Sequence, residues 1–479
     1  MTTGQPYLLG MPATVTYLAQ QGLLDRAFWE PMFPALQYRK EAEMEEWPAN
    51  TGTQIFMTRQ GLLNPATTPL TPGVDPTPKS LSYEQWSATL AQYGDAIDTY
   101  MPNATVQIAN TFLANIKSLG LQAGQTLNRL SRNAMFVAYL SGHTLTIAPA
   151  LSTDVSIHVA SLNGFTDVVN VGTNVAPFPV SPQTPLAVQL GVGTTAITRN
   201  VIGFAADDPN VPLGPGVLFL SAAVGGSGLP YRTAVLSSAR PKLIYSGGGS
   251  TVDSVTSSDL LQLQDIINAS ALLRQQNVMP HEDGFYHAHI DALGNAQVFA
   301  DPVFQRLNTA LPDGIRYAQG FIGHMSGILF FMNTESPVTT NVGNLIQTGN
   351  PSFGTGQALL GQDIDAEIVN DSGIQIGNVI ITGRGVMYER TLDESQFVTE
   401  AGTTGKIGEF SVINNGIAIE TDKIRLVIRA PLDRLMQKVS AAWSISTSFP
   451  IPTDLTAQNG NMRYRRALCL RFALGNISA

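Results

Sequence analysis

The clearest periodic pattern in the chain is an apolar stripe between residues 104 and 139. Apolar side chains recur there at intervals of three and four, which predicts one amphipathic α-helix. They are Ile108, Phe112, Ile116, Leu119, Leu127, Leu130, Ala134 and Val137. A continuous helix of this span would be about 50 Å long at about 1.5 Å per residue. Gly120 and Gly124 are weak points of this helix, which would allow it to bend there.

The residues before this helix predict an arm and a hairpin. Residues 1–53 read as an N-terminal arm with a short amphipathic piece and a charged patch at 39–46. Residues 54–100 predict an extended hairpin, because strand-like and aromatic-rich runs flank a tip rich in turn residues. The tip prolines are Pro65, Pro69, Pro72, Pro76 and Pro78. So long a hairpin cannot bury itself alone, so we expect it to need a neighbour.

The residues after the helix predict a β-rich insertion at 141–250. Short apolar runs at 155–159, 186–190 and 217–220 alternate with Gly, Pro, Asn and Asp. Their spacing is typical of a sandwich or barrel. The helix at 101–140 and this module are therefore expected to be separate parts, with the Ser246–Ser250 run as a flexible exit.

An α/β region is predicted at 251–430 and returning strands at 431–479. Thr256, with Asp259 three residues on, has a capping-box pattern and is expected to open a second helix. The other expected elements are a helix at 302–311 and strands at 284–290, 328–332, 376–388, 407–413, 424–429, 435–449 and 462–473. No internal repeat is evident.

Composition favours an assembly subunit. The 479 residues include only 13% charged side chains, against about 25% in an ordinary soluble domain. A protein that buries surface against its own copies needs less charge for solubility. The net charge of −9 argues against a protein that grips nucleic acid. Cys469 is the single cysteine, which excludes an intrachain disulfide and fits a reducing compartment. No signal peptide or membrane-spanning stretch is evident, so we expect a soluble, intracellular chain.

The string from His281 to Asp291 is the most metal-like pattern. His287 and His289 share one face if this segment is a strand, and we expect them to pack on a half-buried face. A zinc site needs three or four convergent ligands, and no second cluster supplies them. The carboxylates at Asp363, Asp365 and Glu367 lack the glycine and distal glutamate of a calcium loop.

The remaining candidates for chemistry are weak. Gly402–Lys406 is too short for a phosphate loop, and Gly247–Gly249 lacks the strand–loop–helix setting of a dinucleotide site. No G-x-S-x-G elbow occurs, and Cys469 sits in an apolar run. We therefore predict no catalytic, cofactor-binding or metal residues, and no enzyme. The basic patch of Arg463, Arg465 and Arg466 favours a solvated face or an inter-subunit salt bridge over a nucleic-acid contact.

The order of elements resembles the Hong-Kong-97-type (Johnson) capsid fold of tailed phages and herpesviruses. Several motifs are also similar to the major capsid family typified by coliphage N-four. They are Thr71–Asp75, Tyr93–Asp95, Gly124–Leu127, Arg132–Ala134, Asp283–Tyr286, Asp301–Phe304, Gly320–Gly323, Gly327–Phe330, Pro431–Asp433 and Ala442–Trp443. This chain departs from the family at Asp291-Ala292, where His-Pro is frequent, and over 141–250, which matches loosely.

The resemblance implies an α+β fold with an N-arm, an extended hairpin, a spine helix, peripheral and axial domains and an inserted β-rich domain. It implies a major capsid protein that forms pentamers and hexamers of an icosahedral head around double-stranded DNA. The implied partners are copies of itself, a portal protein, a separate scaffolding protein and a decoration protein. DNA contacts would be non-specific, and neither a cofactor nor a membrane is implied. The location would be the virion capsid, assembled in the host cytoplasm.

Two alternatives stay open from the sequence. An encapsulin-like nanocompartment would use the same fold with a protein cargo. A metal-dependent hydrolase would be built on the His281–Asp291 string. Because only 53 residues precede the hairpin, and they carry no long charged coil, we expect no fused scaffold.

Overall fold

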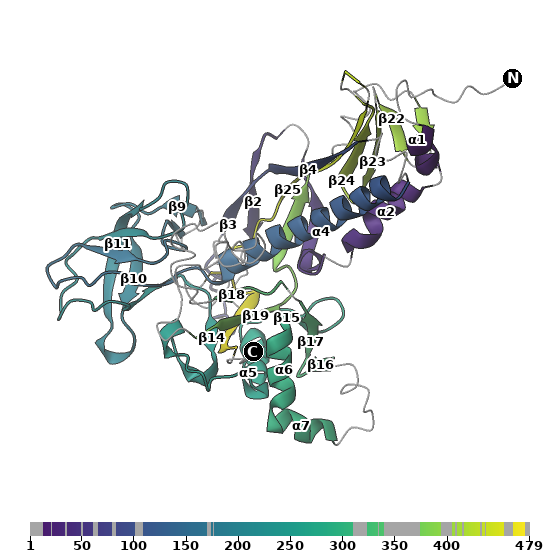
Figure 1. Cartoon of the computed structure of the whole chain (residues 1–479). Helices are drawn as coiled ribbons and strands as arrows, with labels where there is room; N and C mark the ends of the chain where they lie inside the picture. The colour runs from purple at the N-terminus through teal and green to yellow at the C-terminus, as the bar shows by residue number, and fades with distance from the viewer. Residues whose placement is uncertain are drawn as a thin grey trace. The chain divides into compact units, whose positions relative to one another are not determined.

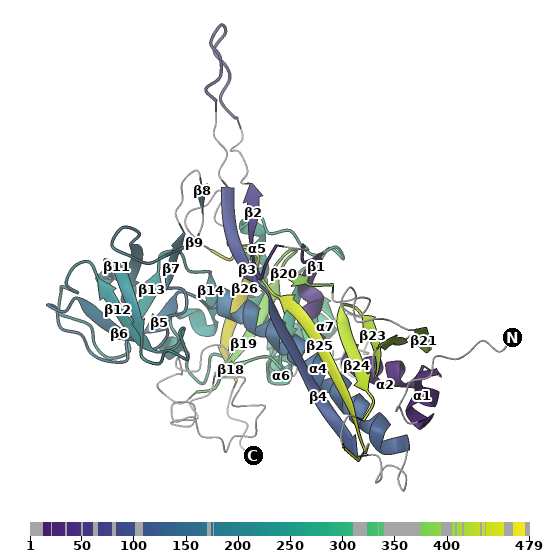
Figure 2. The ribbon, with the colours of Figure 1, turned by 90° about the horizontal axis from the view of Figure 1, so that it is seen from above.

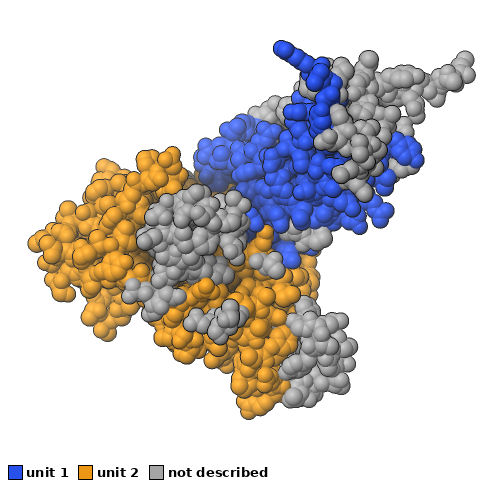
Figure 3. All heavy atoms as spheres, in the orientation of Figure 1, with its two compact units in different colours: residues 1–56, 87–132, 387–450 blue, residues 57–86, 133–386, 451–479 orange. Residues whose placement is uncertain are grey.

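The computed structural model describes most of the chain, and its elements are labelled in Figure 1. The described residues are 13–20, 22–33, 36–48, 51–60, 66–78, 83–100, 109–169, 174–175, 177–309, 323–333, 335–339, 374–393, 405–407, 410–413, 416–431, 434–435, 437–454 and 463–474. The chain forms two compact units (Figure 3). Unit 1 contains residues 1–56, 87–132 and 387–450, and unit 2 contains 57–86, 133–386 and 451–479.

Unit 1 is built on one mixed sheet. Its strand order is β1-β20-β25-β24-β23-β22-β21, and β4 also pairs with β25. The strands are β1 (Ala42–Glu46), β4 (Ala91–Tyr100), β20 (Met387–Thr391), β21 (Gly405–Ile407), β22 (Phe410–Ile413), β23 (Gly416–Thr421), β24 (Ile424–Arg429) and β25 (Lys438–Ser448). Helices α1 (Ala13–Gln20) and α2 (Leu23–Met32), the 3-10 turn η2 (Arg39–Glu41) and α4 (Ala109–Tyr139) as far as Arg132 complete the unit.

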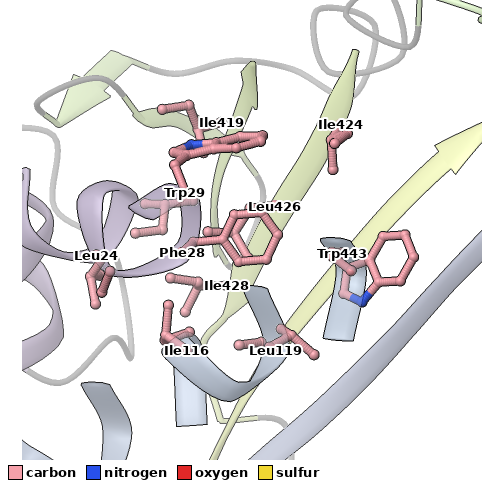
Figure 4. Close-up of a cluster of buried hydrophobic side chains, with 14 of the residues drawn as sticks. Leu24, Phe28, Trp29, Ile116, Leu119, Ile419, Ile424, Leu426, Ile428 and Trp443 are labelled. Atoms are coloured by element: carbon pink, nitrogen blue, oxygen red, sulfur yellow. The ribbon is translucent and has the colours of Figure 1, made fainter. Parts of the chain in front are cut away.

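The core of unit 1 is the apolar stripe of α4 packed on the sheet and on α2. Figure 4 shows side chains from α2, α4 and β23–β25 converging in one cluster. Phe112, Ile116 and Leu119 from the predicted stripe are buried in it. Each such burial contributes about 1.5–3 kcal/mol. The amphipathic helix is therefore confirmed over Ala109–Tyr139, while residues 104–108 lie outside the described part.

Neither Gly120 nor Gly124 interrupts α4, which is continuous from Ala109 to Tyr139. Gly120 has a different purpose in the packing. A Cβ atom at this position would collide with the carbonyl oxygen of Phe28, so glycine lets the backbone of α2 approach α4 closely. The residue that weakens the isolated helix thus makes the helix–helix contact possible.

Unit 2 contains a six-stranded antiparallel β module in the order β5-β13-β10-β11-β12-β6. Its strands are β5 (His143–Leu145), β6 (Ser156–Val159), β10 (Leu186–Leu190), β11 (Ile197–Ala206), β12 (Gly216–Leu220) and β13 (Ala234–Ser237), with β7 (Asp167–Val169) pairing β9 (Pro177–Pro179) beside them. The Ala160 amide donates to the Leu145 carbonyl and Ile147 to His158, which joins β6 back to β5. The expected sandwich or barrel is thus a closed barrel around an aliphatic core.

The second sheet of unit 2 has the order β14-β26-β19-β15-β17-β16, and β18 also pairs with β19. Its strands are β14 (Leu243–Tyr245), β15 (Tyr286–Ile290), β16 (His324–Met325), β17 (Ile328–Met332), β18 (Val338–Thr339), β19 (Ile376–Thr382) and β26 (Ala467–Ala473). Helices α5 (Leu263–Gln275), α6 (Ala292–Ala300) and α7 (Pro302–Thr309) contribute to its core, and η4 (Ser246–Gly248) and η5 (Val252–Ser254) precede them.

The expected helix start at Thr256 is wrong. The amide and hydroxyl of Thr256 donate to the Asp259 carboxylate at 2.7 and 2.9 Å, which makes a turn and not a helical cap. The helix begins at Leu263, where Gln262 and Asp265 form the capping box. The Asp301 carboxylate accepts from the Leu263 amide as well. A distant side chain therefore helps to set the boundary.

The strand pairing differs from the predicted domains in two places. Strands β20 to β24 were grouped with residues 251–386, but they pair in the sheet of unit 1. Residues 91–100 were given to the hairpin, but β4 pairs along its whole length with β25 (Figure 2). In both cases the reason is long-range pairing, which local strand patterns do not encode.

Replacing Gly120 by alanine tests the close approach of α2. In an ordinary helix this change would stabilise by up to about 1 kcal/mol. Here we expect the free energy of unfolding to fall by about 1–3 kcal/mol, because the added methyl group forces α2 away. Urea denaturation of the unassembled subunit measures it, with the exposed Ser118→Ala on the same helix as control. An unfolding free energy equal to or above that of the parent would contradict the packing argument.

Candidate assembly elements

The hairpin is formed by β2 (Gln54–Gln60) and β3 (Tyr83–Thr89), and β3 pairs in parallel with β8 (Asn174–Val175). One face of the strands is buried, with Met57, Trp86 and Ala88 below a tenth exposed. The loop at 66–78 between these strands is exposed at every residue. Leu70 and Val74 in this loop are 70% and 63% exposed. Exposed apolar side chains on a projecting loop suit contact with another surface.

A buried cluster of charges lies at the root of the hairpin, within unit 2. Arg59 of β2 makes ion pairs of 2.5 Å with Glu84 of β3 and with Asp454. Arg466 contacts the same Asp454 oxygen at 3.1 Å. The side chains of Glu84 and Asp454 are 0% and 6% exposed. Burial raises the pKa of Asp454 to about 6, although Arg59 opposes the shift.

Arg463 and Arg465 are buried within unit 2 and Arg466 is half-buried, which corrects the expectation of a solvated face or an inter-subunit contact. Arg463 pairs with Asp167 at 2.7 Å, and its side chain is 4% exposed. Arg465 is also buried, and burial lowers its pKa. Arg466 pairs with Asp454 and donates to the Gly385 carbonyl. The patch therefore fastens the chain internally.

A second buried ion pair fastens the N-terminal segment to the sheet of unit 1. Arg39 donates two hydrogen bonds to Glu389, at 2.8 and 2.9 Å, and one to Asp422 at 2.6 Å. Burial alone would lower the pKa of Arg39, but Glu389 and then Asp422 raise it above its ordinary value. The segment that follows pairs in parallel with β20 as strand β1. One guanidinium thus aligns two segments some 350 residues apart.

A cavity of about 500 Å³ opens beside this ion pair. Its lining includes Glu46, Asp393 and Lys423, and Lys423 pairs with both carboxylates at 3.1 and 3.3 Å. These pairs raise the pKa of Lys423. The carboxylates of Glu46 and Asp393 are therefore paired with a cation of the chain itself, Lys423.

The histidine string packs as expected on one face of β15. The rings of His287 and His289 both contact Phe331, and the His289 side chain is buried. His281 stacks on His287 with centroids 4.0 Å apart, and His287 pairs with Asp283 at 2.8 Å. Burial by itself raises the pKa of Asp283. The hydrogen bonds from His287 and from the Phe285 amide, with the charges of His287 and His281, outweigh burial and lower this pKa.

Asp291 ends this string as a helix cap. Its carboxylate accepts from the amides of Gly294 and Leu293 at the start of α6. Burial raises its pKa. The other candidates are dispersed: Gly247 lies in the turn η4, Lys406 in β21, and Cys469 is buried in β26. Residues 363–367 and 402–404 lie outside the described part. The absence of a catalytic, cofactor or metal site stays a prediction.

Sequence reasoning missed the two buried ion clusters. Arg39 and Glu389, like Arg59 and Asp454, are far apart in the chain and follow no spacing rule. The sequence contains one weak indication of the Arg39 cluster, because Arg39 lies in a charged patch of a charge-poor chain. Among the described helices, none has both the length and the apolar character needed to cross a membrane.

No protein-family model and no curated protein matches the chain. Among solved structures it is similar to the cyanophage Pam1 capsid asymmetric unit, with 9% identity, a TM-score of 0.46, and 89% of this chain and 87% of that one covered. It is similar to the capsid of Ralstonia phage GP4, with 9% identity, a TM-score of 0.45 and coverage of 91% and 88%. A third similar structure is the capsid of Helicobacter pylori bacteriophage KHP30, with 10% identity, a TM-score of 0.40, and 91% of each chain covered.

The Arg39 cluster can be tested by changing Glu389 to glutamine. Removing one charge of a buried pair leaves Arg39 short of its partner, so we expect the unfolding free energy to fall by about 3–5 kcal/mol. The matched control is Glu282→Gln, because Glu282 forms an exposed pair with Arg384. That change should cost less than about 1 kcal/mol. If urea denaturation shows the same loss of unfolding free energy for both changes, the buried pair contributes no more to stability than the exposed one.

Proposed function

We propose that this chain is the major capsid protein of a tailed double-stranded DNA phage. Copies of it assemble into the pentamers and hexamers of an icosahedral head that encloses the genome. The observation that carries the proposal is the hairpin whose loop at 66–78 is exposed throughout while its root is clamped by buried charges. The protein acts as a structural subunit, and its location is the virion capsid.

The hairpin supports this proposal because its exposed loop has the chemistry of a contact surface. Its prolines reduce the conformational entropy lost when the loop docks on another molecule. The partner we infer is a second copy of the chain. In a closed lattice every copy both gives and receives such a contact, so individually weak interfaces sum to a stable shell.

The low charge supports the same proposal. Much of the charge in the described part is used in internal pairs, such as Arg39–Glu389 and Arg463–Asp167. With these arginines buried and a net charge of −9, packed DNA would meet few cations on the subunit. We infer non-specific DNA contact only.

Several finer assignments are also part of the proposal. The chain would belong near the N-four type of capsid protein, with the inserted barrel as an accessory to the shell. A portal protein, a separate scaffolding protein and a decoration protein would be its partners. They rest on the sequence motifs and on the order of elements.

Replacing residues 66–78 by a short Gly-Ser turn tests the central step. We expect a soluble, folded subunit that forms small oligomers and no closed shells, because the docking loop is gone. Negative-stain microscopy and sedimentation measure this beside the parent chain. Normal closed particles from the variant would refute the assembly role of the loop.

The parent particles in the same experiment distinguish the alternatives. Shells that package double-stranded DNA during infection support the phage head. Shells that hold only protein would favour an encapsulin-like compartment. A parent chain that never forms shells and purifies with stoichiometric metal would favour a hydrolase.

A second experiment tests the barrel as an accessory. The Thr146 amide donates to the Thr233 carbonyl, and the Arg232 amide donates to the Thr146 carbonyl. The two segments therefore lie side by side here, and a short turn can connect them. Replacing 148–231 by a short turn keeps Leu145 and Leu236, which help to cover Ile376. We expect this variant to fold.

The matched control replaces 145–248, which removes Leu145 and Leu236 and exposes the cluster beneath them. We expect that variant to be insoluble. Circular dichroism and size-exclusion chromatography of both variants measure the outcome. If the shorter replacement is also insoluble, the barrel belongs to the folding core of unit 2.

A further inference from the structure

The carboxyl group of Asp454 connects the hairpin to the C-terminal segment of unit 2. Its Oδ1 atom contacts both Arg59 of β2 and Arg466, at 2.5 and 3.1 Å. Its Oδ2 atom is buried and has no hydrogen-bond partner among the residues that the structure describes. One oxygen thus takes two cations while the other is free to hold a proton.

The backbone around this group is held in an uncommon conformation. Asp454 and Tyr464 have φ angles of 55° and 51°, in the left-handed region that non-glycine residues seldom adopt. The Tyr464 amide donates to the Thr453 carbonyl at 3.0 Å. The Tyr464 ring also contacts Tyr139 at the end of α4. Surrounding contacts therefore impose this geometry on Asp454.

In the described part of the chain, the charged and titratable groups near Asp454 come from the hairpin, from α4 and from the C-terminal segment. Arg59 and Glu84 come from the hairpin, where the Trp86 ring lies 6.0 Å from the Arg59 guanidinium. Tyr139 comes from α4. Tyr464, Arg465 and Arg466 come from the C-terminal segment.

We propose that Asp454 is a proton-linked clamp, which holds the root of the hairpin to the C-terminal segment more tightly when its carboxyl group is protonated. Two neighbouring arginines would by themselves favour the charged form of Asp454 and lower its pKa. Burial outweighs them, however, since the pKa of Asp454 is raised to about 6. Release of the hairpin admits water and returns that pKa toward its ordinary value of 3.8.

The sign of the pH dependence follows from linkage. Between the two pKa values, the clamped state binds a proton that the released state does not. The clamp is therefore tightest at the acid end and weakens as the pH rises through about 6. Between pH 5 and pH 8 the equilibrium constant for release should grow about tenfold. The consequence for docking on another copy rests on the proposed function, but the clamp itself does not.

Hydrogen exchange of the unassembled full-length subunit tests the clamp. After correction for the intrinsic rates, exchange in the peptides of β2 and β3 should rise about tenfold from pH 5 to pH 8. Asp454→Asn cannot titrate and should remove this dependence. The matched control is Asp253→Asn, since Asp253 forms a partly exposed pair with Arg232 in the same unit. This control should keep the pH dependence of the hairpin.

Each outcome decides one question. Exchange that is independent of pH, or that slows as the pH rises, would overturn the clamp. If Asp454→Asn fails to fold, the emission of Trp86 in the parent provides the second measurement, with Trp86→Phe to identify its share. A pH-independent Trp86 signal would equally overturn the inference. Because these measurements use free subunits, a failure of shell assembly would bear on the proposed function alone.

Discussion

The packing of α4 on the sheet of unit 1 is the constraint on which that unit depends. The helix contributes a stripe with a period near 3.6, and the sheet contributes alternate residues of β24 and β25 with a period of 2. The two patterns meet in one cluster, to which Ile116, Leu119 and Trp443 all belong. Gly120 allows α2 to close this cluster from another side. The long helix is therefore part of the core of unit 1 and not a free rod.

The charges of this chain are used as connectors. Pairs such as Arg39–Glu389, Arg59–Asp454 and Arg463–Asp167 join segments far apart in sequence. A buried ion pair gives little net stability compared with apolar packing, but a wrong alignment would leave a charge unpaired and costly. We infer that these pairs select the correct placement of segments that the hydrophobic clusters alone would not fix.

The sequence predicted the elements better than their partners. The helix at 104–139 and most of the strands were readable because each pattern is local, and the barrel followed from short runs at regular spacing. Long-range pairing was not readable: β20 pairs with β1 and β25, and β4 pairs with β25, although these strands lie far apart in sequence. The start of α5 was misplaced because Asp301 helps to set it through tertiary contact. The burial of Arg463 and Arg465 was missed for the same reason, since their environment comes from other segments.

The open edge of β4 and the exposed loop at 66–78 differ in their chemistry. Among the strands that the structure describes, only β25 pairs with β4, and none of them pairs with its other edge. Asp95 and Asp98 lie on this strand, and charges on an edge discourage pairing with another chain. Gln122 of α4 donates to Asp95, and this bond lowers the pKa of Asp95, which keeps it ionised. The edge thus carries a lasting charge, whereas the exposed loop at 66–78 presents Leu70 and Val74. Under the proposed function, such a contrast would direct association toward the loop and away from the sheet edge.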